Sequence, residues 1–142
     1  MLVILILPFS LYPLFKKVSS YKSYSAAEYI SIKLPFSIYT AWVTIASLAN
    51  FMVTLVYFRQ NWPNNFLIIA AAISLLIGLF ITIKILQRFK NIPFAAVVIW
   101  AYFGIIAAQL SLNQPAYTVV ITAAAAVVII ILQITAVYSA SN

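Results

Sequence analysis

The chain divides into five apolar runs separated by short polar stretches. A helix that crosses a bilayer needs about 20 predominantly apolar residues, and four of the runs approach or exceed this length. These four runs cover residues 35–58, 65–86, 93–110 and 115–138. The fifth run, residues 2–15, is shorter and contains Pro8 and Pro13, a residue type that bends or ends a helix. The pattern predicts an all-α transmembrane bundle with four full spans plus one short or partial N-terminal span.

The composition agrees with this prediction and narrows the class of protein. Of the 142 residues, 66% are hydrophobic and 6% are charged, which is typical of an integral membrane protein. We expect a single transmembrane domain over residues 1–142, with the lipid bilayer as its surroundings. The net charge of +7 comes from the short connections and not from one basic helix face, so nucleic acid is not an expected partner.

The basic residues are concentrated in alternate connections. Seven of the eight Lys and Arg residues fall within residues 16–33 and 84–92, whereas the opposite connections hold only Arg59. Cytoplasmic loops of membrane proteins carry the excess of Lys and Arg. We therefore predict that both basic connections and the C-terminus face the cytoplasm, and that Met1 lies outside if the first run crosses the membrane.

The sequence lacks the side chains that most enzymes use. It has no His and no Cys, and its one acidic residue, Glu28, lies in a connection. General acid–base catalysis needs a group that titrates near neutral pH, and a metal ion needs several converging ligands. We therefore expect no enzyme activity, no catalytic residue, no metal site and no required cofactor.

The run at residues 35–58 carries polar side chains on one helix face. At about 100° per residue, five hydroxyl-bearing residues fall within one arc, namely Ser37, Thr40, Thr44, Ser47 and Thr54. This face is expected to point into protein. Trp42, Ala46 and Asn50 follow one another at intervals of four and form a ridge on another side of the helix. The helix is therefore predicted to be buried on two sides and central in the bundle.

Three side chains in the spans leave two interpretations open. An unsatisfied amide inside a membrane costs roughly several kcal/mol, so Asn50 needs a partner either in a neighbouring helix or in a ligand. Trp42 is too deep for the interfacial aromatic belt, so it either packs in the bundle or walls a pocket for a flat apolar ligand. The same two interpretations apply to Trp100.

Small residues recur at intervals of four in the three later spans. The sets are Ala70, Ser74 and Gly78, then Gly104 and Ala108, then Thr118, Thr122 and Ala126. In a membrane, small residues let two helix backbones approach closely. These sets predict helix packing within the chain, with a dimer interface as the alternative.

The stretch LPFSIYTAWVTIASLAN, residues 34–50, resembles a signature helix of the TspO/MBR family of tryptophan-rich sensory or translocator proteins. The matching positions are Pro35, Phe36, Tyr39, Trp42, Ala46, Ser47 and Asn50. The chain looks more like the longer bacterial and algal members, which have further helices after this signature. Residues 92–105, IPFAAVVIWAYFGI, look like part of that extension.

The resemblance implies a helical bundle whose cavity binds a porphyrin or another tetrapyrrole, or a sterol-like apolar molecule. The candidate ligand-binding residues are Trp42, Ala46 and Asn50, which match the signature, together with Trp100. That fold places several helices before the signature, so the resemblance also implies N-terminal helices supplied by another chain, or a homodimer. The expected function is to bind, sense or translocate the ligand. The alternative is a non-catalytic structural or assembly subunit that docks a partner helix on the hydroxyl face of residues 35–58.

Overall fold

The computed structural model describes residues 2–20, 24–58 and 64–139, and these residues form helices joined by short connections, with no strand among them. The helices are α1 (Leu2–Ser20), α2 (Ala26–Glu28), the π-helical turn η1 (Tyr29–Lys33), α3 (Leu34–Phe58), α4 (Asn64–Phe89), α5 (Ile92–Leu110) and α6 (Tyr117–Ser139). Four helical stretches, Ala26–Phe58 and the three that follow, are long and apolar enough to cross a membrane. The predicted fold class is therefore confirmed. Lys22 and Arg59, which entered the charge pattern, lie outside the described residues.

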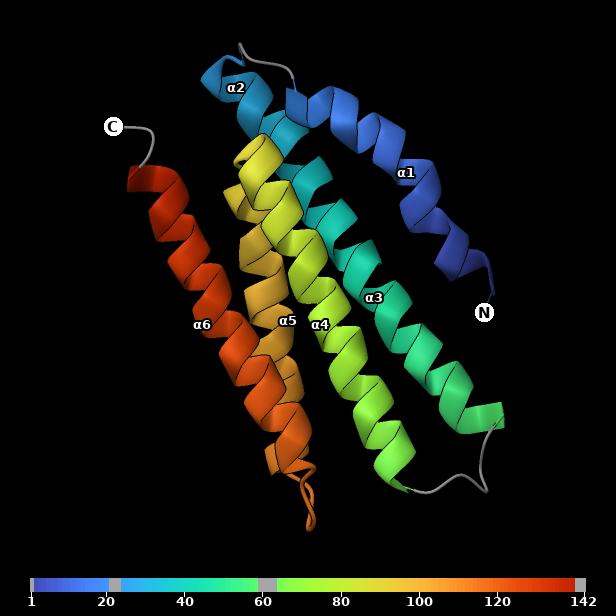
Figure 1. Cartoon of the computed structure of the whole chain (residues 1–142). Coiled ribbons are helices and arrows are strands. Elements are labelled where there is room, and N and C mark those ends of the chain that lie inside the picture. Colours follow the sequence, from blue (N-terminus) through green and yellow to red (C-terminus); the bar gives the residue numbers. More distant parts are fainter. Residues whose placement is uncertain (1, 21–23, 59–63, 140–142) are drawn as a thin grey trace.

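The four long helices stand side by side, and α1 lies outside them against α3 (Figure 1). Helix α3 contacts α1, α4 and α5, whereas α6 packs against α4 and α5 on the opposite side of the bundle. The expectation that α3 is buried on two sides and central is wrong, because Trp42 is 53% exposed and α6 packs on α4 and α5 instead of on α3. The arrangement creates two helix–helix interfaces that differ in packing, and we call them joints. The α1 joint lies between α1 and its neighbours, and the α4–α5–α6 joint lies among those three helices.

Helix α1 continues five residues beyond the apolar run and passes through both of its prolines. Pro8 and Pro13 lie inside the helix, which curves rather than ends (Figure 1). The extra residues at the end of α1 are stabilised by packing contacts, which a hydropathy pattern does not indicate. Ser19 is polar, yet its side chain is buried because it meets a polar partner at the start of α5.

The joint among α4, α5 and α6 is filled by small and branched side chains. Gly78 of α4 allows Tyr102 of α5 to approach so closely that a Cβ atom at Gly78 would lie 2.6 Å from the Tyr102 hydroxyl oxygen. That hydroxyl donates to the Leu75 carbonyl at 2.6 Å, and the Ala123 side chain of α6 is fully buried. The predicted packing role of Ala70, Ser74 and Gly78 is therefore confirmed for Gly78 and for Ser74, which is also buried.

The other two small-residue sets pack differently from the expectation. Gly104 has nothing within 4 Å of the position of a Cβ atom, and Ala108 is exposed, so this pair does not pack within the described chain. On α6, Ala126 is buried as predicted, Thr122 is half-buried and Thr118 is exposed. The other buried residues of α6 are Val119, Ala123, Val127 and Ile130. The prediction was wrong for Gly104, Ala108 and Thr118, because spacing identifies a helix face without identifying the neighbouring helix.

The hydroxyl face of α3 points into the protein, as predicted. Ser37, Thr40 and Ser47 are buried, and the hydroxyls donate to backbone carbonyls one turn earlier in the same helix. Thr44 and Thr54 are half-buried and make the same kind of bond. Each of these hydroxyls therefore donates within its own helical backbone, and Ser37 Oγ also accepts a hydrogen bond from Asn91.

A buried asparagine joins three segments at one end of the bundle. Asn91 is 1% exposed, and its Nδ2 atom donates to Ser37 Oγ of α3 at 2.8 Å and to Ser19 Oγ of α1 at 3.4 Å. Its Oδ1 atom accepts from the Phe94 backbone N–H and so caps α5. The preceding residue, Lys90, has a positive φ of 49°, which turns the chain sharply between α4 and α5. We call the contact of Asn91 with Ser19 and Ser37 the Asn91 junction.

Candidate functional site

A cavity of about 790 Å³ lies between α1, α3 and α4. It is lined by Pro8, Tyr12 and Phe15 of α1, by Thr40 and Thr44 of α3, and by Phe80, Ile81, Lys84, Ile85, Gln87, Arg88 and Phe89 of α4. Ligand pockets in proteins commonly measure about 300–1,000 Å³ and are mostly apolar. The cavity therefore has the size and the character of a small-molecule site.

The cavity lies between α4 and α1, which packs along α3 and has buried contacts near its C-terminal end. Phe15 is buried, with ring centroids 5.7 Å from Phe89 and 5.8 Å from Phe94. One turn after Phe15, the Asn91 junction attaches α1 to the start of α5 through Ser19. Towards its N-terminus, α1 contributes Pro8 and Tyr12 to the cavity wall, and these bulky side chains keep the backbone of α1 away from that of α4. A hollow remains beneath them.

The inner wall of the cavity offers few free polar groups. Thr40 Oγ1 donates to the Phe36 carbonyl at 2.7 Å, and Thr44 Oγ1 donates to the Thr40 carbonyl at 2.8 Å. Every buried polar side-chain atom in the described part of the chain has a hydrogen-bond partner. The deep part of the cavity is therefore suited to the apolar part of a ligand, because no buried donor among the described residues there lacks a hydrogen-bond partner.

Two cationic side chains stand at the rim of the cavity. Lys84 and Arg88 are four residues apart on α4, and both line the cavity and reach solvent. Lys84 Nζ lies 5.4 Å from the centroid of the Phe80 ring, and Arg88 Cζ lies 5.5 Å from that of Phe89. The acidic residue Glu28 accepts from the Ser25 backbone N–H at 2.9 Å in a capping box. It forms no ion pair with either cation in the part of the chain that the structure describes.

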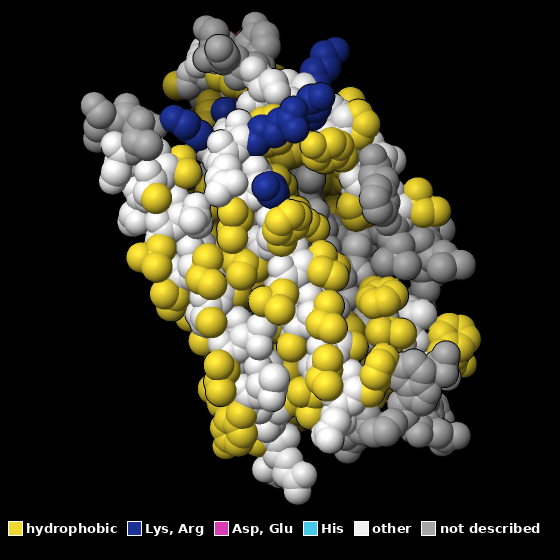
Figure 2. All heavy atoms as spheres, in the orientation of Figure 1, with side chains coloured by type: hydrophobic (Ala, Val, Ile, Leu, Met, Phe, Trp, Pro, Cys, Tyr) yellow, Lys and Arg dark blue, Asp and Glu magenta, His cyan; other side chains and the backbone are white. Residues whose placement is uncertain are grey.

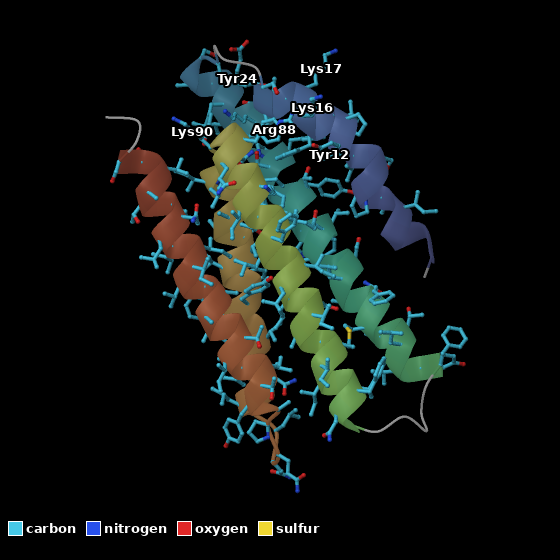
Figure 3. All side chains as sticks on the ribbon, viewed as in Figure 1. Tyr12, Lys16, Lys17, Tyr24, Arg88 and Lys90 are labelled. Atoms are coloured by element: carbon cyan, nitrogen blue, oxygen red, sulfur yellow. The ribbon has the colours of Figure 1, made fainter. Side chains whose placement is uncertain are left out.

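The rim belongs to a wider basic end of the molecule. Figure 2 shows the Lys and Arg side chains gathered at one end above a face of apolar side chains. Figure 3 labels Lys16 and Lys17 of α1, Arg88 of α4 and Lys90 of the α4–α5 turn at this end. The predicted grouping of residues 16–33 and 84–92 on one side of the bundle is therefore present in the fold.

The sequence-predicted ridge on α3 lies elsewhere. The Trp42 side chain is 53% exposed on the outer surface, and Ala46 is half-buried. Asn50 Nδ2 donates to the Ala46 carbonyl at 2.8 Å, within its own helix. The expected partner in another helix or a ligand is therefore replaced by the backbone one turn earlier. None of these three residues lines the cavity of α1, α3 and α4.

Trp100 also lies on the outside of the bundle. It is 70% exposed and lines an open groove of about 490 Å³ between α3 and α5. Ile38 lines the same groove and precedes Trp42 by one turn of α3. The structure thus places both tryptophans on the outer side of α3 and α5, where lipid meets the protein.

Sequence reasoning did not single out the residues that do line the cavity. It assigned Thr40 and Thr44 to helix packing or to docking of a partner helix, and it counted Lys84 and Arg88 among the charges of the basic connections. One signal was available: Phe80, Lys84 and Arg88 follow one another at intervals of four, which places an aromatic ring and two cations on one helix face. The contribution of Tyr12 could not be found this way, because it depends on where α1 docks.

Comparison with known proteins identifies the family. The family model described as TSPO-like protein matches residues 1–138, which is nearly the whole chain. No curated protein and no solved structure matches the chain. The chain therefore belongs to the TSPO-like protein family, as the α3 signature indicated.

Proposed function

Starting from this membership, we propose that the protein binds an apolar molecule carrying an acidic group, of which a tetrapyrrole is the leading example, in the cavity between α1, α3 and α4. A single observation carries the proposal: the cavity has apolar walls in its depth and two cations, Lys84 and Arg88, at its rim. The protein acts as a binding component that senses or passes on this ligand, and the proposal includes no catalytic step and no metal.

The charge at the rim favours a tetrapyrrole over a sterol. A tetrapyrrole has a flat apolar ring and carboxylate side chains, so the ring would lie against Tyr12 and Phe80 while the carboxylates meet Lys84 and Arg88. Hydrogen bonds between a cation and a carboxylate are roughly twice as strong as those between neutral groups. A sterol has only a hydroxyl group to offer, and the Thr40 and Thr44 hydroxyls are already bonded to backbone.

A pair of matched substitutions tests where the ligand binds. Thr44→Phe places a phenyl ring in the cavity, whereas Ala46→Phe adds similar bulk two residues away on the outer ridge. Titration of the purified protein with protoporphyrin, followed by the absorbance band of the ligand, gives the dissociation constant of each variant. We expect Thr44→Phe to weaken binding at least about tenfold, or 1.4 kcal/mol, and Ala46→Phe to leave it unchanged.

The reverse result would move the site to the outer ridge. Loss of binding in Ala46→Phe and in Trp42→Phe, with Thr44→Phe unaffected, would assign the ligand to the surface of α3 and contradict the proposal. Absence of binding in the unmodified protein would reject the proposed function itself. A neutral sterol that binds as tightly as protoporphyrin would reject the role given to Lys84 and Arg88.

We also propose that the basic end faces the cytoplasm, because cytoplasmic loops carry the excess of Lys and Arg. The chain contains no cysteine, so single cysteines can report accessibility without background. A cysteine at Lys90 is expected to react with an impermeant thiol reagent only after cells are opened, and one at Asn113, in the α5–α6 connection, before. The opposite pattern would invert the orientation.

A second candidate function is assembly with another helix through α5. Docking on the hydroxyl face of α3, as first expected, is contradicted because that face is covered within the chain. The surface that remains is around Gly104 and Ala108, where no described atom approaches. A Gly104→Cys variant that forms a disulfide-linked dimer in membranes, with no such product from Val128→Cys on α6, would support a homodimer.

A further inference from the structure

We propose that one acyl chain of an anionic phospholipid occupies the cavity between α1, α3 and α4 when no other ligand is bound, with the lipid phosphate held between Lys84 and Arg88. The inference rests on the same cavity as the proposed function but not on the identity of its ligand. It assigns the cavity a resident lipid, which any other ligand must displace.

The position of the two cations along α4 fits a lipid headgroup. Lys84 and Arg88 precede the last residue of α4, Phe89, by five residues and by one. At about 1.5 Å per residue they lie roughly 8 Å and 2 Å from the helix end, which is the depth of the bilayer interface. A phosphate at this depth can meet both side chains while its acyl chains point into the membrane.

The hollow beneath these cations fits an acyl chain. The wall below them is formed by Phe80, Ile81 and Ile85 of α4, with Pro8 and Tyr12 of α1 opposite. The hydroxyls of the α3 wall are bonded to their own backbone, so hydrocarbon leaves no buried donor without a partner. Because α1 packs along α3, the space between α1 and α4 is reached from the side, where the bilayer lies.

The charge of this end favours anions from outside the chain. The described cations here include Lys16, Lys17 and Lys33, and the acidic Glu28 is engaged with Ser25. Lys84 and Arg88 are four residues apart on α4, a spacing at which like charges repel and a bound anion relieves the repulsion. Anionic lipids are attracted to such clusters, and basic pockets between spans bind their headgroups. Lys84 and Arg88 differ from the other cations because an apolar cavity lies directly below them.

The test measures which lipid the purified protein retains. The detergent-purified chain is mixed with equal amounts of phosphatidylglycerol and phosphatidylcholine, and bound lipid is counted by native mass spectrometry. We expect a preference of about fivefold or more for phosphatidylglycerol in the unmodified protein. The variant Lys84→Gln/Arg88→Gln is expected to lose the preference, and the control Lys17→Gln/Lys33→Gln, which removes the same charge at the same end, is expected to keep it.

Two further arms separate the specific site from simpler attraction. Thr44→Phe, which narrows the cavity and keeps both cations, is expected to lower retention of phosphatidylglycerol. Excess glycerol phosphate is expected to displace little lipid, since it lacks the acyl chain. An equal loss in both charge variants would show diffuse attraction only, and efficient displacement by glycerol phosphate would show a phosphate site without a chain; either would overturn the proposal. Because lipid retention is measured without a porphyrin, its failure is distinct from failure of porphyrin binding.

Discussion

The two joints of the bundle show how side-chain size decides whether membrane helices touch or leave a space. Among α4, α5 and α6, Gly78 and Ala123 let the helices approach closely, and the cavity beside Tyr102 measures only about 220 Å³. Between α1 and the bundle, the cavity measures about 790 Å³. Apolar side chains line most of both joints, so hydrophobicity alone does not account for the difference.

The difference follows from the forces that act in a bilayer. Burying a leucine gains little when the alternative is lipid, so close contact between helices depends on small residues and hydrogen bonds. The α4–α5–α6 joint includes the small residues Gly78, Ala123 and Ala126. Among the described contacts of α1 are the Asn91 junction and the rings that pack around Phe15. Because α1 packs along α3, it leaves room for a ligand between itself and α4.

The largest expected effect comes from adding a phenyl ring to the α4–α5–α6 joint, with the same addition to the α1 joint as the comparison. Ala123→Phe places a phenyl group where the side chain is fully buried, so we expect destabilisation of about 3 kcal/mol or more and a failure to purify as a monodisperse protein. Thr44→Phe, which enters the cavity, is expected to change stability by less than about 1 kcal/mol. Thermal unfolding in detergent measures both, and equal losses would show that the cavity is filled in solution.

The two glycines of the chain give a milder version of the same comparison. Gly78→Val would push against the Tyr102 hydroxyl and disturb its bond to Leu75, with an expected cost of about 2–3 kcal/mol. Gly104→Val meets open space, so its cost is expected to stay below about 0.5 kcal/mol. Apparent melting temperatures should rank the two variants in this order. A large loss in Gly104→Val would reveal a partner at the outer face of α5.

Removing the Asn91 junction should weaken the attachment of α1 to the bundle and leave the packing of the other helices unchanged. Asn91→Ala deletes the bonds to Ser37 and Ser19 and the cap of α5, so we expect a loss of about 2 kcal/mol. The release should be local, and a cysteine at Ser10 of α1 should become more reactive towards thiol reagents than in the unmodified background. Asn113→Ala, in an exposed connection, is the control. Unchanged reactivity at residue 10 would mean that Phe15 alone holds α1.

The smallest effect is expected from a single hydroxyl at the cavity wall. Thr44→Val keeps the shape of the side chain and removes a bond that Thr44 makes only with its own helix at 2.8 Å. We expect a stability change within about 0.5 kcal/mol, since a hydroxyl that bonds back to its own helix adds little to the fold. A clear loss in thermal unfolding would indicate that this hydroxyl has a second partner.

Most of the fold could be predicted from the pattern of apolar runs. The spans and the inward direction of the α3 hydroxyl face follow from periodicity and from the cost of polar groups in lipid, whereas the expected burial of α3 on a second side does not hold, because Trp42 is exposed. The extension of α1 to Ser20 could not be predicted, because Ser19 is kept in the helix by a partner 72 residues away. The failure of the Gly104 and Ala108 pair to pack has the same origin, since one helix does not reveal its neighbours.

The candidate site could be predicted only in part. The sequence placed Trp42, Ala46 and Asn50 on a separate ridge, but it could not show that this ridge faces outward. Asn50 satisfies its amide within α3, which periodicity alone does not indicate. The cavity arises from the way α1 docks, and docking depends on Phe15 meeting Phe89 and Phe94. The hydropathy pattern of a single run of residues does not indicate long-range contacts of this kind.

The connection between α4 and α5 also constrains how the protein is assembled. The two helices are separated only by Lys90 and Asn91, and the positive φ of Lys90 folds them back on each other at once. Two helices joined by so short a connection form an αα-hairpin. Ser19 and Ser37 precede Asn91 in the chain by 72 and 54 residues. The Asn91 junction can therefore form only after synthesis has passed the α4–α5 turn, so this attachment of α1 follows the synthesis of α4.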